Sequence, residues 1–151
     1  MKDKFWTYPA EAESGRKIII TGRDNVDKPR LSGKYIYRLT VSWDYESLPD
    51  GMPADADASV MEQATDLLLE ETRRDTAAIL TGIYTGDGRR DWVFYTRSLF
   101  IFQKILNRAL ESLPQLPLQI EAAEDCGWEE YLDMRAQTYI PDDEDFADNP
   151  F

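Results

Sequence analysis

Arginine, hydroxyl and carboxylate side chains alternate along several short segments of this chain, and together they could recognise an anion. A guanidinium group binds carboxylates and phosphates through paired N–H donors, and hydroxyl groups add hydrogen bonds beside it. If these segments are neighbouring strands of one sheet, their polar sides form a single basic face. The candidate ligand-binding residues on that face are Arg23, Arg38, Ser42, Tyr95, Arg97 and Glu121. An ordinary solvated face of an antiparallel sheet, the more common situation, shows the same alternation.

Acidic side chains form a second candidate region at Glu121, Glu124, Asp125, Glu129 and Glu130. Two of these carboxylates could hold Mg²⁺ or act as an acid–base pair. A solvated acidic edge in which Asp125 caps a helix is the commoner use of such residues, and we favour it. Cys126 lies among these acids with no base nearby in sequence, so we expect an inert thiol.

The residue types that are missing exclude several reactions. The chain has no histidine, which removes Ser-His-Asp and Cys-His catalysis, imidazole acid–base chemistry and histidine metal ligands. Its single cysteine excludes a CxxC redox pair and a cysteine-rich zinc site. No glycine-rich phosphate loop opens a helix, since the segment GIYTGDGRR joins two expected strands.

These exclusions favour a binding or regulatory module that acts through protein–protein contacts. We predict no catalytic residue, no metal and no cofactor. The alternative is a small-ligand or anion-binding protein, or an enzyme, that uses arginine and carboxylate side chains on the open sheet face. A pocket with converging charged groups would favour the alternative, and a flat polar sheet face would favour the module.

Charge is divided unevenly along the chain. Residues 121–151 contain eleven acidic side chains and one basic side chain, whereas residues 14–43 contain seven basic and two acidic side chains. Such asymmetry governs partners and association rates rather than the fold. We expect the acidic end to fold back on the basic region or to meet a basic protein. The same acidic charge argues against nucleic acid as a partner.

The stretch from Lys34 to Tyr45 has the clearest local pattern. Its odd-numbered residues are aromatic or aliphatic and, apart from Ile36, its even-numbered residues are polar or charged. Successive side chains of a strand point to opposite faces, so this pattern predicts a strand with one buried and one wet face. Arg38 and Ser42 belong to the wet face.

Shorter patterns predict the other strands. Residues 17–23 are rich in β-branched side chains, residues 77–96 form a hairpin whose turn contains two glycines, and residues 117–123 are a last strand. Residues 24–33 are expected to be a loop, because proline and glycine interrupt a polar stretch. The aromatic side chains within residues 5–8 are expected to dock on the body.

Apolar stripes at helical spacing predict three helices. The first begins near Asp57 or Ser59, where Ser59 and Glu62 match a capping box. The second spans about residues 98–113, and a short one spans residues 127–136.

This order of elements predicts an α+β fold, with a mainly antiparallel sheet and two helices packed on one face. From Lys34 to Ala123 it is the ferredoxin-like β-α-β-β-α-β order, to which an N-terminal strand is added. In that topology the long strand lies inside the sheet. Residues 17–23 must therefore pair elsewhere, or the topology must be a variant.

The length suits one domain, which we place at residues 1–138, followed by an acidic, flexible tail at 139–151. No apolar stretch is long enough for a membrane span, and the N-terminus lacks the apolar core of a secretory signal. The lone cysteine fits a reducing compartment. We therefore expect a cytoplasmic protein with a protein partner and no membrane contact, and the sequence leaves its oligomeric state open.

Several segments resemble a bacterial family of unknown function. They are FWTYP, ESGRKIIITGR, YRLTVSWDY, AAILTGIYTGDGRRDWVFYT and PLQIEAAEDCGWEEY, within Phe5 to Met134. On these motifs the chain is similar to domain of unknown function 695, and the resemblance implies neither an activity nor site residues. Some members look to be fused to a domain similar to the B-type regulator of ribonuclease E activity, a protein inhibitor of an RNase. No such second domain is expected in these 151 residues.

Overall fold

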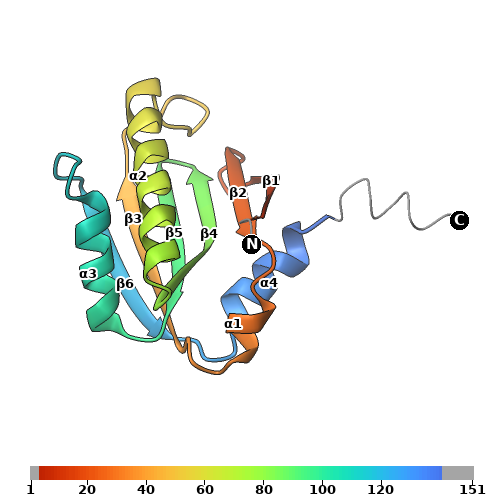
Figure 1. The fold of residues 1–151 in the computed structure, drawn as a ribbon. Helices are drawn as coiled ribbons and strands as arrows, with labels where there is room; N and C mark the ends of the chain where they lie inside the picture. Colours follow the sequence, from red (N-terminus) through yellow and green to blue (C-terminus); the bar gives the residue numbers. More distant parts are fainter. Residues whose placement is uncertain (1–3, 141–151) are drawn as a thin grey trace, which may run out of the picture.

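A computed structural model describes residues 4–140, and residues 1–3 and 141–151 lie outside that description. The acidic run Asp142–Asp145 and most of the tail predicted at 139–151 therefore fall outside the described residues. The described strands form one antiparallel sheet in the order β1-β2-β4-β5-β3-β6, accompanied by four helices, which confirms the α+β class (Figure 1). The strands are β1 (Phe5–Glu11), β2 (Lys17–Arg23), β3 (Tyr37–Asp44), β4 (Ala78–Gly86), β5 (Arg89–Thr96) and β6 (Leu118–Glu124). The helices are α1 (Asp27–Leu31), α2 (Asp55–Arg74), α3 (Leu99–Leu110) and α4 (Glu129–Thr138).

Strand β3 lies inside the sheet and supplies much of the core, as its alternation predicts. Its side chains Leu39, Val41 and Trp43 are buried in one cluster with Met61 of α2 and Phe102 of α3. On either side β3 pairs antiparallel with β5 and β6. Removal of these apolar side chains from water is the main driving force for holding α2 and α3 against the sheet.

The hairpin of β4 and β5 confirms the predicted turn. Its two connecting residues, Asp87 and Gly88, have φ angles of 53° and 83°. A two-residue turn with both φ angles positive matches the right-handed twist of an antiparallel pair. The strands extend to Gly86 and Arg89, so only two residues connect them.

The N-terminal strands show where residues 17–23 pair. Strand β2 lies antiparallel beside β4, with Ile20 opposite Tyr84, and β1 pairs with the outer side of β2. Trp6 docks on the body as expected, since it packs against the buried cluster that contains Tyr131, but the strand that residues 5–11 form was not predicted. Gly22 permits this pairing, since a Cβ at that position would lie 2.2 Å from the ring of Trp6.

Two helix predictions need correction. Residues 27–31, expected within a loop, form the short helix α1. Helix α2 begins at Asp55, two residues before the predicted Asp57 and four before Ser59, and it has no side-chain cap. Acidic residues in its first turn face the positive end of the helix dipole instead. Helix α3 has the expected start, where Ser98 Oγ accepts a hydrogen bond from Ile101 N–H. None of the described helices is both long enough and apolar enough to cross a membrane.

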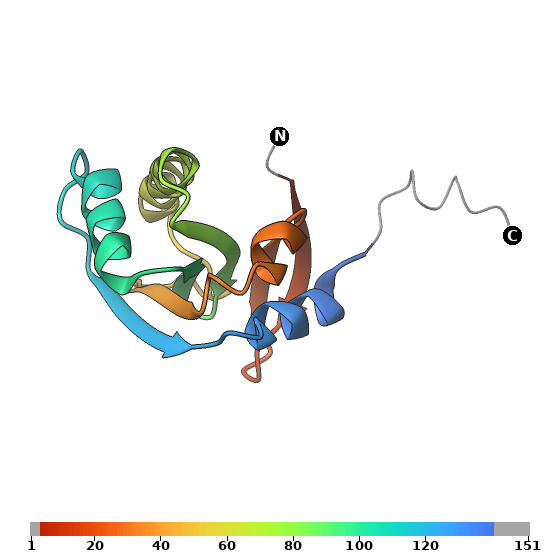
Figure 2. The same ribbon diagram turned by 60° about the horizontal axis from the view of Figure 1, so that its bottom comes forward.

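Helix α4 covers part of the second face of the sheet, which was expected to be open (Figure 2). Its side chains Tyr131 and Met134, with the preceding Trp128, form a second buried cluster there. The Trp128 ring stacks on Tyr95 of β5, with centroids 4.2 Å apart. The wet face predicted from β3 is therefore divided into a covered part and an exposed part.

Candidate functional site

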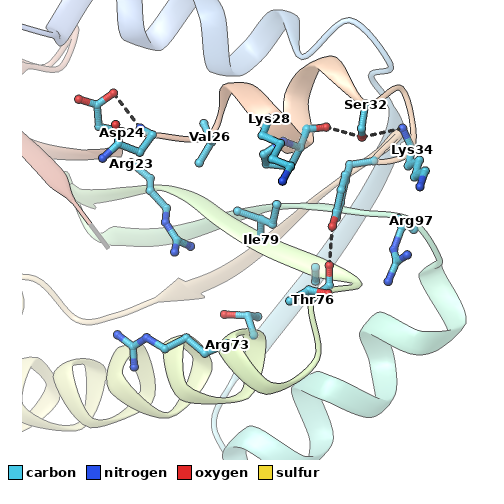
Figure 3. Close-up of a pocket in the computed structure, with 15 residues that line it drawn as sticks. Arg23, Asp24, Val26, Lys28, Ser32, Lys34, Arg73, Thr76, Ile79 and Arg97 are labelled. Carbon is cyan, nitrogen blue, oxygen red and sulfur yellow. Dashed lines mark hydrogen bonds between the residues drawn. The ribbon is translucent and has the colours of Figure 1, made fainter. Parts of the chain in front are cut away.

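A pocket of about 550 Å³ opens between helix α1, the C-terminal end of α2 and the adjoining ends of β2 and β4 (Figure 3). Val26, Ala78 and Ile79 give it apolar surface. Five separate segments contribute its cationic residues, which are Arg23 from β2, Lys28 from α1, Lys34 from the following loop, Arg73 from α2 and Arg97 after β5. This convergence makes the pocket the candidate site.

The one carboxylate that lines the pocket, Asp24, is already bound. Its Oδ1 atom accepts hydrogen bonds from Arg135 Nη1 at 3.0 Å and from the N–H of Asn25 at 2.8 Å. Burial alone would raise the pKa of Asp24, but these hydrogen bonds and the Arg135 charge lower it below its usual value. Asp24 is therefore ionised, and it is paired with Arg135, which does not line the pocket.

Tyr35 holds the wall of the pocket in place. Its hydroxyl group donates to the backbone oxygen of Thr76 at 2.7 Å, which ties the loop after α1 to the end of α2. Its own backbone oxygen accepts from Trp128 Nε1 at 2.9 Å, which ties the same loop to α4. The guanidinium of Arg97 lies 5.7 Å from the Tyr35 ring centroid, within reach of a cation–π interaction.

Two of the six predicted residues, Arg23 and Arg97, line this pocket. The other four lie on the sheet face that α4 partly covers, where Arg38 is opposite Tyr95. Arg23 is three positions from Ile20, which packs in the α4 cluster, so its side chain leaves the sheet on the opposite face. The expected single basic face is therefore not formed.

Sequence reasoning missed three of the lining cations: Lys28, Lys34 and Arg73. The excess of positive charge in residues 14–43 was the available signal for the first two. Nothing in the sequence pattern connects Arg73 with them, because helix α2 brings it there only in the folded chain.

On the sheet face, Asp125 binds two of the predicted ligand-binding side chains, Arg38 and Tyr95. Its Oδ2 atom accepts hydrogen bonds from Arg38 Nη1 at 2.9 Å and from the Tyr95 hydroxyl at 2.7 Å. The backbone N–H groups of Glu129 and Glu130 also donate to this carboxylate, so Asp125 binds the first turn of α4 as expected, although Trp128 occupies the N-cap position. Burial raises the pKa of Asp125, but the Tyr95, backbone and Arg38 hydrogen bonds outweigh it, so the net pKa is lowered.

The remaining sheet-face residues are open to solvent or bound to neighbours. Ser42 donates to Asp91 Oδ1 at 2.6 Å and accepts from Arg89 at 2.8 Å. Glu121 is exposed on the edge strand β6. Within residues 4–140, no three carboxylate or thiol side chains gather closely enough to hold a metal ion, and Cys126 is an exposed free thiol. This face therefore offers a ligand less unsatisfied charge than the pocket does.

Comparison with known families gives a match to one family model, described as Family of unknown function (DUF695), over residues 6–134. The chain belongs to the DUF695 family. No curated protein matches its sequence. The matched residues include all five cationic residues of the pocket and the whole of the six-stranded sheet except Phe5.

In this DUF695 chain, one carboxyl group is buried with incomplete hydrogen bonding. The Tyr84 hydroxyl donates to Glu130 Oε2, while Oε1 of Glu130 is buried and has no hydrogen-bond partner. Burial raises the pKa of Glu130, which the Tyr84 hydrogen bond and the Arg38 charge only partly oppose. An ionised carboxylate is therefore unfavourable at this position.

Glu130→Gln is expected to stabilise the DUF695 chain by about 1 kcal/mol at neutral pH. A carboxyl group whose pKa is higher in the folded chain than in the unfolded chain lowers the free energy of unfolding above its folded pKa. This destabilisation disappears as the pH falls, because the group is then protonated in both states. Urea unfolding of both proteins at pH 7.5 and pH 4 measures the difference. Glu129→Gln, at the exposed neighbouring position, is the control. A gain that persists unchanged at pH 4 contradicts this account.

Proposed function

We propose that this chain is a binding module without catalytic activity and that it recognises an anionic ligand in the pocket beside α1. The observation that carries the proposal is the convergence of Lys28, Lys34 and Arg97 on a pocket whose one lining carboxylate, Asp24, is paired with Arg135. Among residues 4–140, Lys28, Lys34 and Arg97 form no ion pair. Their charges are available to a ligand.

Isolated surface cations are common, and the proposal depends on their arrangement. Cationic side chains around one concavity with apolar walls create a local positive potential that a flat surface of equal charge does not. An anion that enters loses part of its hydration, but it gains charge-assisted hydrogen bonds, which are about twice as strong as neutral ones. Val26 and Ile79 supply the apolar walls.

The fold and the location of the protein are inferred on separate grounds. The order β4-β5-β3-β6 supports a ferredoxin-like core, with α2 and α3 on one face and β1 and β2 added at the β4 edge. The single cysteine supports a reducing, cytoplasmic compartment. The family resemblance supports a bacterial origin.

Titration of the whole chain with inorganic tripolyphosphate tests the proposed function. We expect binding at low salt that weakens as salt is added, because the interaction is electrostatic. Lys28→Glu and Arg97→Glu should each weaken binding about tenfold or more, since each removes a charge-assisted contact and adds repulsion. Both side chains are solvent-accessible, so the variants should remain folded.

Lys17→Glu is the matched control. It makes the same change of charge at an exposed lysine of β2 that does not line the pocket. We expect it to change the dissociation constant by less than about threefold, as a long-range effect screened by salt. Equal losses in Lys17→Glu and Lys28→Glu would show a general attraction to the basic region and would contradict a pocket.

A further inference from the structure

The cations of the pocket are spread along it rather than gathered around one point. Figure 3 shows Arg23 and Arg73 toward one end, Lys34 and Arg97 toward the other, and Lys28 between them, with Ile79 on the opposite wall. A compact anion such as a single phosphate can contact only part of such a row. Arg23 already donates to the backbone oxygen of Leu80 at 3.3 Å and Arg73 has contacts of its own, so a ligand with several negative groups along its length meets Lys28, Lys34 and Arg97.

Exposed apolar side chains, here called the apolar rim, lie within four positions in the chain of the lining residues Ser32 and Arg97. The rim consists of Leu31, Leu99, Phe100 and Ile101. Leu31 directly precedes the lining residue Ser32 and is 72% exposed, and Phe100 follows Arg97 by three positions and is 69% exposed. These are the two most exposed large apolar side chains among the described residues. Figure 1 places α1, the end of α2 and the start of α3 at the same end of the molecule.

Apolar groups beside a basic pocket favour some classes of polyanion over others, here an acidic protein segment over single-stranded RNA. An exposed apolar surface next to charged groups is typical of a protein interface, where the apolar part is removed from water and the charges set specificity. Single-stranded RNA would require open aromatic rings for base stacking. The aromatic rings of the pocket and the rim already have cations over them, since Arg97 lies 5.7 Å from the Tyr35 ring centroid and Lys104 Nζ lies 4.6 Å from that of Phe100.

We propose that the pocket and the apolar rim together bind an acidic segment of a protein chain that carries large apolar side chains. Consecutive carboxylates of this segment lie along Lys28, Lys34 and Arg97, and its apolar side chains cover the rim. This inference rests on the proposed anion-binding function and names its ligand. Residues 142–151 of this chain, outside the described residues, have the required composition, since they read DDEDFADNPF.

A labelled synthetic peptide of sequence DDEDFADNPF is the probe, and fluorescence anisotropy measures its binding. The protein is the full-length chain carrying Asp142→Asn, Asp143→Asn, Glu144→Gln and Asp145→Asn, so that its own acidic run does not compete. We expect saturable binding. Replacing both phenylalanines of the peptide by alanine should weaken binding at least fivefold, and Lys34→Glu in the protein should weaken it about tenfold.

A rim variant separates this inference from the anion-binding function. In the same protein, Leu31→Ser with Phe100→Ser should weaken peptide binding at least fivefold and leave the affinity for tripolyphosphate unchanged. If the protein with an intact rim binds tripolyphosphate but not the peptide, the inference is overturned and the proposed function stands. If that protein binds neither tripolyphosphate nor the peptide, the proposed function is refuted. Equal affinity for the alanine peptide, or tighter binding of oligouridine than of the peptide, also overturns the inference.

Discussion

Replacing Asp125 by alanine is expected to lower the free energy of unfolding by about 3–5 kcal/mol. The Asp125 side chain is only 3% exposed and accepts four hydrogen bonds, two of them from the backbone of α4. In the alanine variant the Arg38 guanidinium and the Tyr95 hydroxyl lose their shared acceptor, and two N–H groups in the first turn of α4 lose theirs. Urea unfolding followed by circular dichroism measures the loss.

The pH dependence and a matched variant make this expectation specific. Because the pKa of Asp125 is lowered in the folded chain, its stabilising contribution is present above the unfolded pKa and is lost as the pH falls through the folded pKa. The difference between the wild type and Asp125→Ala should therefore shrink in acid. Asp133→Ala, an exposed aspartate of the same helix, should cost less than about 0.5 kcal/mol. Similar losses in the two variants would contradict the network.

Local periodicity is the reason that the centre of the fold could be predicted. Strand β3 alternates with period two, and its apolar side is buried as expected. The hairpin turn was recognisable because Asp87 and Gly88 suit positive φ angles. Strand β1 contains Pro9 and helix α1 has five residues, so neither shows a sustained period. Both are fixed by tertiary contacts, such as the hydrogen bond from Trp6 Nε1 to Thr138 Oγ1 at 2.8 Å.

The candidate site was only partly predictable for the same reason. Alternation identified Arg38, Ser42 and Tyr95 as residues of one face, and the strand register places them there. It did not reveal that Trp128 and Asp125 would cover and bind Tyr95, because those residues belong to a distant segment. A pocket between two helix ends has no signature in sequence spacing. Whether any of the predicted ligand-binding residues contacts a ligand stays a prediction.

The pairing of β2 with β4 requires a glycine at position 86, and its replacement is the second large effect we expect. A Cβ on Gly86 would lie 2.2 Å from the backbone oxygen of Lys17 and 2.7 Å from Ile18 Cα, both of which belong to β2. Neither backbone atom can move without breaking the ladder between the two strands. Gly86→Ala is therefore expected to destabilise the chain by about 3 kcal/mol or more, measured by urea unfolding.

Gly88→Ala separates this steric effect from backbone strain. Gly88 has a φ of 83° in the same turn, but the atom nearest to a Cβ added there would be the backbone oxygen of Tyr45, at 3.9 Å. Only the cost of a left-handed conformation, about 1–2 kcal/mol, is expected there. Hydrogen exchange should also accelerate at the β2 amides in Gly86→Ala and not in Gly88→Ala, because only the first substitution pushes β2 away. If the two variants were equally destabilised and the hydrogen exchange of the β2 amides were unchanged in both, β2 would not be paired with β4 at Gly86. The placement of both N-terminal strands would then be wrong.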